Sequence, residues 1–136
     1  MKKFFTPLLL ALAILIPTAI VEAADVPSFS RVAGSYVPFK LREENRKNGR
    51  RTYYYECSVD LRENFATQYI NLLRRSGLNY IGHEAKDWRR TSAQYLDKWI
   101  LSCRGQRVEV WQFRYFAQGR MTFSVKVPYG LTYEDD

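Results

Sequence analysis

The chain has 136 residues, which is enough for one hydrophobic core and excludes a multidomain architecture. Its formal net charge of +7 comes mostly from arginine, which favours anionic partners such as envelope polymers, anionic lipid or acidic protein surfaces. The two cysteines form no C-x-x-C pair and there is a single histidine, so a thioredoxin-type redox site, a zinc ribbon and an H-E-x-x-H zinc protease are excluded.

The N-terminus has the pattern of a secretory signal peptide. Met1-Lys2-Lys3 is positively charged, residues 4–20 are almost wholly apolar, and the small residues Val21 and Ala23 fit cleavage after Ala23. An uncleaved membrane anchor is the alternative, but the apolar stretch is at the lower length limit of a spanning helix. We therefore expect the signal peptide to be removed.

Cleavage divides the chain into a signal peptide at residues 1–23, an extended leader at 24–36 and a single domain at 37–136. The leader contains Pro, Gly and Ser without periodicity, which favours extended backbone. We expect the domain to be exported to the periplasm, the cell surface or the medium, with no membrane span after cleavage.

The domain is predicted to begin with two strands joined by a basic loop. Residues 36–41 read as a short strand, which Pro38 confines to a sheet edge. Residues 42–51 lack apolar side chains and contain the turn dipeptide Asn48-Gly49, so they are predicted to form a solvated hairpin tip. Residues 52–59 are rich in tyrosine and predict a strand whose odd-numbered side chains share one face.

Residues 61–76 predict the main helix. Asp60 and Glu63 have the spacing of a capping box, and apolar side chains follow at helical intervals. Gly77 supplies the left-handed residue that ends many helices.

The stretch 86–103 is ambiguous after a short predicted strand at 78–82. Its aromatic residues fit a helical stripe, yet 95–103 also reads as a strand. We favour the strand because Arg104-Gly105 links it to another aromatic-rich run, which is typical of a hairpin. A helical turn over 86–92 is predicted to precede it.

The last two predicted strands are residues 107–116 and 121–127. In the first, the apolar alternation slips at Trp111, which indicates either a bulge or burial of both faces. In the second, apolar and polar side chains alternate regularly. The predicted fold is α+β: a small domain with a mostly antiparallel sheet of about five strands and helix 61–76 on one face.

Cys57 and Cys103 are predicted to form a disulfide, because an even pair of cysteines in an exported chain usually does. Such a bond would stabilise the domain by about 3–4 kcal/mol. The alternatives are two buried free thiols or one catalytic thiol.

The catalytic alternatives are weaker. His83 precedes Glu84 but has no second histidine to share a metal, so it is expected to be a surface or loop residue. We expect no metal and no cofactor. A small cell-envelope hydrolase with a carboxylate pair remains an alternative, and its candidate carboxylates are Glu56, Glu63, Glu84 and Asp87.

A basic cluster in the loop carries the functional prediction. Its anion-binding residues are Arg46, Lys47, Arg50 and Arg51, with Tyr54 as a stacking neighbour. We expect a non-enzymatic domain that binds an anionic envelope polymer or an acidic protein partner. Nucleic acid is an unlikely partner for an exported chain. The alternatives are an inhibitor or accessory protein that binds a partner by its sheet, and a surface charge that serves only solubility.

Overall fold

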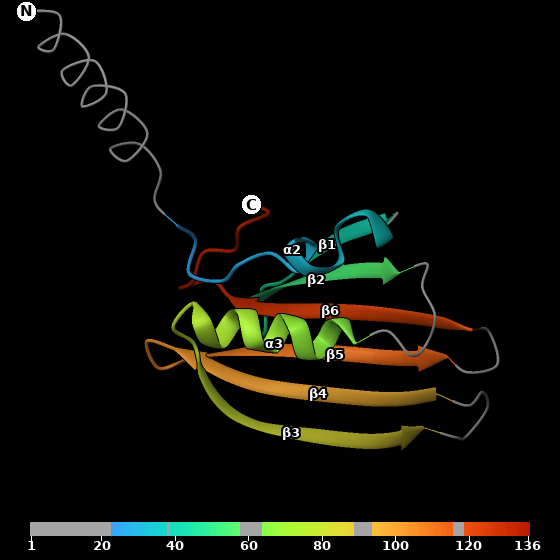
Figure 1. Cartoon of the computed structure of the whole chain (residues 1–136). Coiled ribbons are helices and arrows are strands. Elements are labelled where there is room, and N and C mark those ends of the chain that lie inside the picture. Colours follow the sequence, from blue (N-terminus) through green and yellow to red (C-terminus); the bar gives the residue numbers. More distant parts are fainter. Residues whose placement is uncertain (1–22, 38, 58–63, 89–93, 116–118) are drawn as a thin grey trace, which may run out of the picture.

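Six strands form one antiparallel sheet, and the helices lie on one of its faces (Figure 1). The computed structural model describes residues 23–37, 39–57, 64–88, 94–115 and 119–136. The strands are β1 (Phe39–Asn45), β2 (Arg50–Cys57), β3 (Asn79–Trp88), β4 (Gln94–Cys103), β5 (Gln106–Tyr115) and β6 (Arg120–Pro128). The helices are α2 (Ser30–Ala33), the 3₁₀ helix η2 (Gly34–Tyr36) and α3 (Phe65–Arg75).

The strand order is β1-β2-β6-β5-β4-β3. The hairpin β1–β2 precedes α3, and the meander β3–β6 follows it, so the pairing of β2 with β6 joins the two parts. The predicted small α+β domain with an antiparallel sheet is confirmed, with six strands instead of about five. None of the described helices is long and apolar enough to cross a membrane.

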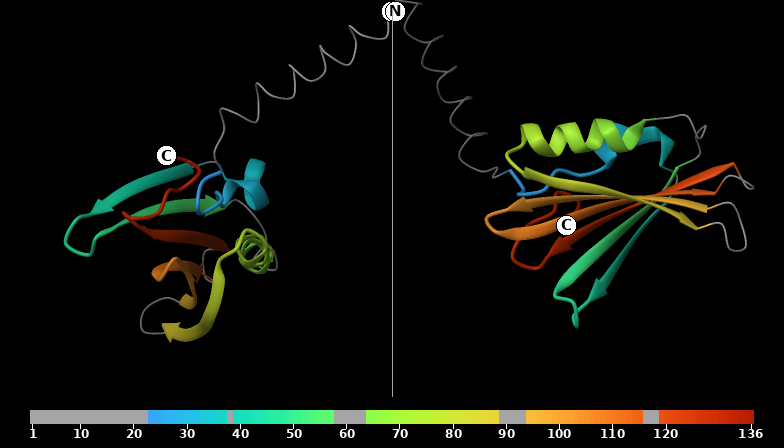
Figure 2. Two further views of the ribbon diagram at one scale, coloured as in Figure 1. Left: turned by 90° about the vertical axis from the view of Figure 1, so that its left-hand side faces the viewer. Right: turned by 90° about the horizontal axis from the view of Figure 1, so that it is seen from below.

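The two faces of the sheet differ sharply. Figure 2 shows α2 and α3 on the same side of the sheet, and we call this side the helix face and the other the open face. Met121, Phe123, Val125 and Val127 of β6 are buried on the helix face. Because successive side chains of a strand alternate, Ser124 and Lys126 lie on the open face.

The predicted slip in β5 reflects burial on both faces. Its pairing with β4 and β6 is continuous, so of the two predicted alternatives the bulge does not occur in this strand. Val108 and Val110 are buried on the helix face, whereas Glu109 is buried on the open face. The bulge lies instead in β3, between Tyr80 and Gly82.

The leader is part of the core, which corrects the prediction of an extended segment at 24–36. Residues 30–36 are helical, and Val26 and Phe29 are fully buried. The ring of Phe29 lies 4.6 Å from that of Phe123 and 5.3 Å from that of Tyr69 on α3. The apolar side chains of the leader thus fill the space between the sheet and α3, which its lack of periodicity concealed.

The main helix is shorter than predicted. It begins at Phe65, after an N-cap at Asn64 whose side chain makes no capping hydrogen bond. The predicted capping box at Asp60 and Glu63 lies outside the described residues.

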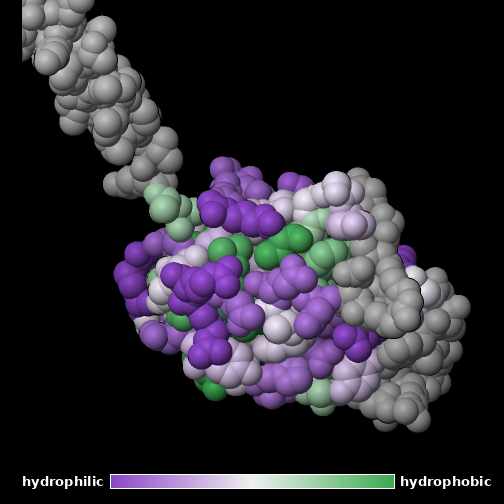
Figure 3. Space-filling model, viewed as in Figure 1, coloured by the Kyte–Doolittle hydropathy of each residue, from purple (hydrophilic) through white to green (hydrophobic). Residues whose placement is uncertain are grey.

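On the helix face, hydrophilic side chains cover most of the described surface, with only small hydrophobic areas between them (Figure 3).

The later strands largely follow the prediction. The strand interpretation of 95–103 is confirmed by β4, and the hairpin at Arg104-Gly105 is confirmed by positive φ angles of 49° and 74°. The predicted helical turn over 86–92 is wrong at its start, because residues 86–88 belong to β3. Residues 89–92 and the signal segment 1–22 lie outside the described residues.

The predicted disulfide is wrong, because Cys57 and Cys103 are free thiols at opposite ends of the sheet. Cys57 pairs with Met121, and the same row continues through Arg114 to Tyr95 of β4. Cys103 is at the far end of that strand, roughly 26 Å away at about 3.3 Å per residue. A disulfide needs Cα atoms within about 7 Å.

We expect Phe29→Ala to lower the free energy of unfolding by about 3–5 kcal/mol, because it leaves a cavity among three aromatic rings. Chemical denaturation measures this. Tyr36→Ala is the matched control in the same segment; its side chain is 51% exposed and its loss should cost about 1 kcal/mol or less. Equal effects would contradict the inclusion of the leader in the core.

Candidate functional site

The open face carries four cationic side chains around one buried carboxylate. Glu109 is only 5% exposed. Its Oε2 accepts a hydrogen bond from Arg50 Nη1 at 3.0 Å and lies 3.3 Å from Arg107 Nε. Its Oε1 accepts one from Trp111 Nε1 at 2.9 Å and lies 3.5 Å from Lys98 Nζ. We call Arg50, Lys98, Arg107 and Lys126 around Glu109 the cationic cluster.

Neighbouring strands place these side chains together. Lys126 of β6 is paired with Glu109 of β5, and Lys98 of β4 is paired with Trp111 two residues further along β5. Residues paired across strands have side chains on the same face. Arg50 begins β2 beside β6, so four adjacent strands contribute to the cluster.

Among the four cations of the cluster, Lys126 is the one that makes no ion pair with a carboxylate of the described residues. Its ammonium lies 3.7 Å from the centre of the Trp111 ring. Burial lowers the pKa of Lys126, the charges of Arg50 and Lys98 lower it further, and Glu109 opposes them. Burial disfavours a charge of either sign, whereas the positive charges of Arg50 and Lys98 that repel Lys126 would attract an anion at the same place.

The cluster has more hydrogen-bond donors than it can satisfy internally. Two guanidinium and two ammonium groups carry about sixteen N–H bonds, whereas one carboxylate offers about four lone-pair positions. Glu109 already uses some of these positions for Trp111 and Arg50. The remaining donors can bind carboxylate, phosphate or sulfate oxygens from outside.

An aromatic row continues from the cluster along β5. The ring centres of Trp111 and Phe113 are 6.0 Å apart, and those of Phe113 and Tyr115 are 6.4 Å apart. Lys126 covers a face of Trp111, and the guanidinium of Arg120 lies 4.6 Å from the centre of Tyr115. A cation therefore lies over the ring at each end of the row, Trp111 at one end and Tyr115 at the other. A ligand that approaches these two rings from that side contacts the cations first.

The structure does not bring the predicted anion-binding residues together as one surface. Arg46 and Lys47 are exposed at the tip of the β1–β2 hairpin, as predicted. Arg50 and Arg51 are consecutive in β2, so they point to opposite faces. Only Arg50 joins the cationic cluster, and Tyr54 shares its face further along the strand.

Arg51 is a structural residue. It is 5% exposed on the helix face, where its Nη2 donates to the carbonyl of Leu131 at 2.8 Å. Its Nε donates to the Tyr53 hydroxyl at 2.9 Å, and its guanidinium pairs with Asp136 at 3.4 Å. These contacts hold the C-terminal segment against β2 and leave Arg51 no access to a ligand on the open face.

The histidine and the buried cysteine considered as catalytic candidates lie in surroundings that do not favour catalysis. His83 is an exposed residue of β3, so the prediction of a surface or loop residue holds for the surface and not for a loop. Its Nε2 is 2.9 Å from Asp97 Oδ1 and its ring stacks on Trp99. Burial raises the pKa of the Cys57 thiol to about 12, which disfavours the thiolate that a nucleophile needs. Within the described residues, no three His, Cys, Asp or Glu side chains form a group able to hold a metal.

The candidate carboxylate pairs are not supported. Glu56 on β2 and Glu84 on β3 are separated by four strand intervals, or about 19 Å at ~4.8 Å each. Glycosidase carboxylates lie about 5–9.5 Å apart. Glu63 and the side chain of Asp87 lie outside the described part of the chain.

Glu109, Lys98, Arg107 and Lys126 were not identified as site residues from the sequence. A glutamate in the interior of an aromatic-rich strand was the available signal, since such a residue needs cationic partners when it is buried. Arg107 is two residues away on the same strand, but Arg50, Lys98 and Lys126 are on other strands, and only the register identifies them. Comparison with protein-family models, curated proteins and solved structures finds no match to this chain.

We expect Glu109→Gln to destabilise the protein by about 1–3 kcal/mol at neutral pH, because the clustered cations then repel one another without compensation. Burial raises the pKa of Glu109, but the bond from Trp111 and the charges of Lys98, Arg50 and Arg107 together bring it below its usual 4.5. The folded pKa is the lower one, so this stabilisation is present above pH 4.5 and is lost as the pH falls further.

Denaturation of the wild type and of Glu109→Gln from pH 7 to pH 3 measures the difference. The gap between the two proteins should narrow in acid. Glu56→Gln is the matched control, since its side chain is 50% exposed and its ion pair with Arg120 spans 3.8 Å; it should cost less than about 1 kcal/mol. A gap that stays constant below pH 4.5 would contradict the role given to Glu109.

Proposed function

We propose that this protein is an exported, non-enzymatic binding domain that holds an anionic polymer of the cell envelope on the open face of its sheet. The observation that carries the proposal is the excess of cationic donors around Glu109. Contacts with Glu109 and Trp111 already order these side chains, so less side-chain entropy is lost when they bind a ligand.

The shape of the site favours a long ligand over a small one. The hollow beside the cluster, lined by Glu84, Leu96, Lys98 and Trp111, has a volume of only about 30 Å³. This is close to the volume of one water molecule. The ligand therefore lies across the surface, where Arg46 and Lys47 at the hairpin tip extend the positive charge beyond Arg50.

The proposed signal-peptide cleavage is compatible with the first contacts of the folded domain, which begin at Asp25. The Asp25 carboxylate accepts hydrogen bonds from the Thr132 backbone at 2.8 Å and from both Arg104 Nη atoms, and Val26 is buried. Cleavage after Ala23 leaves all these contacts intact. N-terminal sequencing of the exported chain checks this part of the proposal, and a sequence that starts elsewhere would oppose it.

The test uses dextran sulfate as a polyanion and uncharged dextran as its control. We expect the wild type to bind only dextran sulfate, with an affinity that falls steeply between 50 and 200 mM salt, because bound counterions are released. The double variant Lys98→Gln/Lys126→Gln should bind about tenfold more weakly and with a shallower salt dependence.

The control variant Arg74→Gln/Arg75→Gln removes the same charge from α3, on the other face of the sheet. It should change the affinity less than twofold. Equal losses in the two double variants would mean that net charge alone drives binding, and salt-independent binding would reject the proposal.

A further inference from the structure

The outer edge of β1 is an uninterrupted strand edge. β1 is the first strand of the sheet order, and Figure 2 shows it outermost, with no described segment along its far side. Its pairing with β2 runs without a break over seven residues. The opposite edge, β3, is interrupted by its bulge. The backbone groups of an edge strand that point outward can pair with another extended chain.

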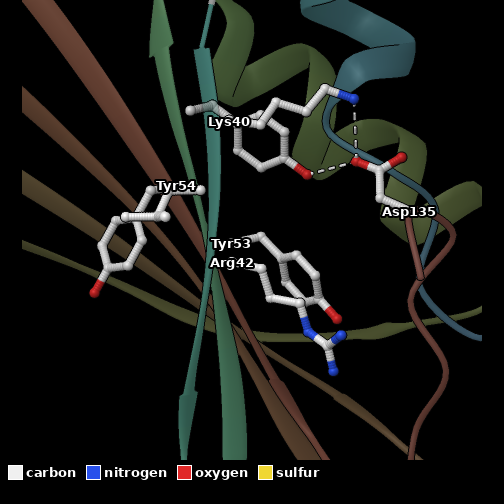
Figure 4. A pocket seen from close by; sticks show the side chains of 7 residues that line it. Lys40, Arg42, Tyr53, Tyr54 and Asp135 are labelled. Atoms are coloured by element: carbon white, nitrogen blue, oxygen red, sulfur yellow. Dashed lines mark hydrogen bonds and ion pairs between the residues drawn. The ribbon is translucent and has the colours of Figure 1, made fainter.

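A pocket opens beside this edge. It has a volume of about 280 Å³ and is lined by Lys40, Leu41, Arg42, Tyr53, Tyr54, Tyr55 and Asp135. Figure 4 shows Lys40, Arg42 and Tyr53 on the side of the strands that carries Asp135, and Tyr54 on the other side. The volume is just below the roughly 300–1,000 Å³ of small-molecule sites, so a side chain of a bound peptide suits it better than a cofactor.

The cations of the pocket are only partly neutralised. Lys40 and Arg42 have side chains 52% and 48% exposed. Their ion pairs with Asp135 and Asp136 are long, at 3.7 Å each, and Arg42 also donates to Glu44 at 2.9 Å. Each therefore keeps N–H groups free for a further acceptor.

We propose that an extended peptide with an acidic–apolar–acidic triplet binds as a seventh strand along β1. Its acidic side chains would lie opposite Lys40 and Arg42, where one can enter the pocket. Its apolar side chain would lie opposite Leu41, which is 49% exposed on the other side of the strand. Residues directly opposite across antiparallel strands are close enough to select one another by charge and shape.

This surface is separate from the one proposed to bind polymer. It uses the outer edge of β1, whereas the cationic cluster lies on the open side of β2, β4, β5 and β6. Each proposal can therefore fail without the other.

The probe is the peptide Thr-Lys-Lys-Glu-Val-Glu-Thr, which matches β1 in antiparallel register and has no net charge. The matched control is Thr-Glu-Glu-Lys-Val-Lys-Thr, in which the charges are exchanged. We expect the control to bind at least about tenfold more weakly, since like charges then oppose one another. Lys40→Glu should weaken binding of the probe about fivefold or more, and Arg75→Glu on α3 less than twofold.

Amide hydrogen exchange supplies a readout that needs no variant. Binding should slow exchange at alternate residues of β1, because only outward-facing N–H groups gain a partner. Equal affinity for both peptides, or binding without slower exchange in β1, overturns the proposal. Binding of neither peptide means that the charges of β1 only protect the edge. If exchange in β1 slows as the protein concentration is raised in the absence of peptide, a second copy of the protein occupies the edge instead.

Discussion

The alternation of side chains along the central strands determines both the hydrophobic core and the charged surface of this protein. In β6, every second side chain from Met121 to Val127 is buried beneath the helices, and the intervening ones are polar. In β5 the same period places Val108 and Val110 in the core and Glu109 and Trp111 on the open face. Two adjacent central strands thus serve as the wall of the core and as the base of a charged surface.

Glu109 makes that charged surface possible. Four cations at such short range would repel one another, and a single buried carboxylate holds three of them through direct contacts. Because Trp111 also donates to Glu109, the aromatic row and the cations are fixed by one group. The carboxylate does not neutralise the cluster, and the remaining positive charge is what an anionic ligand can use.

The sequence predicted the local features of this fold and missed the features that depend on distant contacts. The tyrosine-rich strand, the hairpins at Asn48-Gly49 and Arg104-Gly105, and the helix that ends before Gly77 follow from residues close in the chain. The burial of Phe29 depends on residues of β6 and α3. The distance between Cys57 and Cys103 depends on the order of all the strands except the two edge strands.

The candidate site likewise combines residues that the sequence identified with residues that only the strand register identifies. Basic residues near the first hairpin were visible in the sequence, but strand alternation separates Arg50 from Arg51, and only register brings Arg50 to Glu109. The amino-acid composition shows that the chain has surplus positive charge. It does not identify which cations share one surface, because cross-strand partners are fixed only when the sheet forms.

The most direct test is a residue-by-residue map of amide chemical-shift changes as dextran sulfate is added at low salt. If the cationic cluster binds the polyanion, the largest changes surround Glu109, Trp111 and Lys126, in the middle of the sheet, and α3 is unaffected. Changes confined to the hairpin tip at 46–49, or spread evenly over the basic residues of both faces, would contradict it.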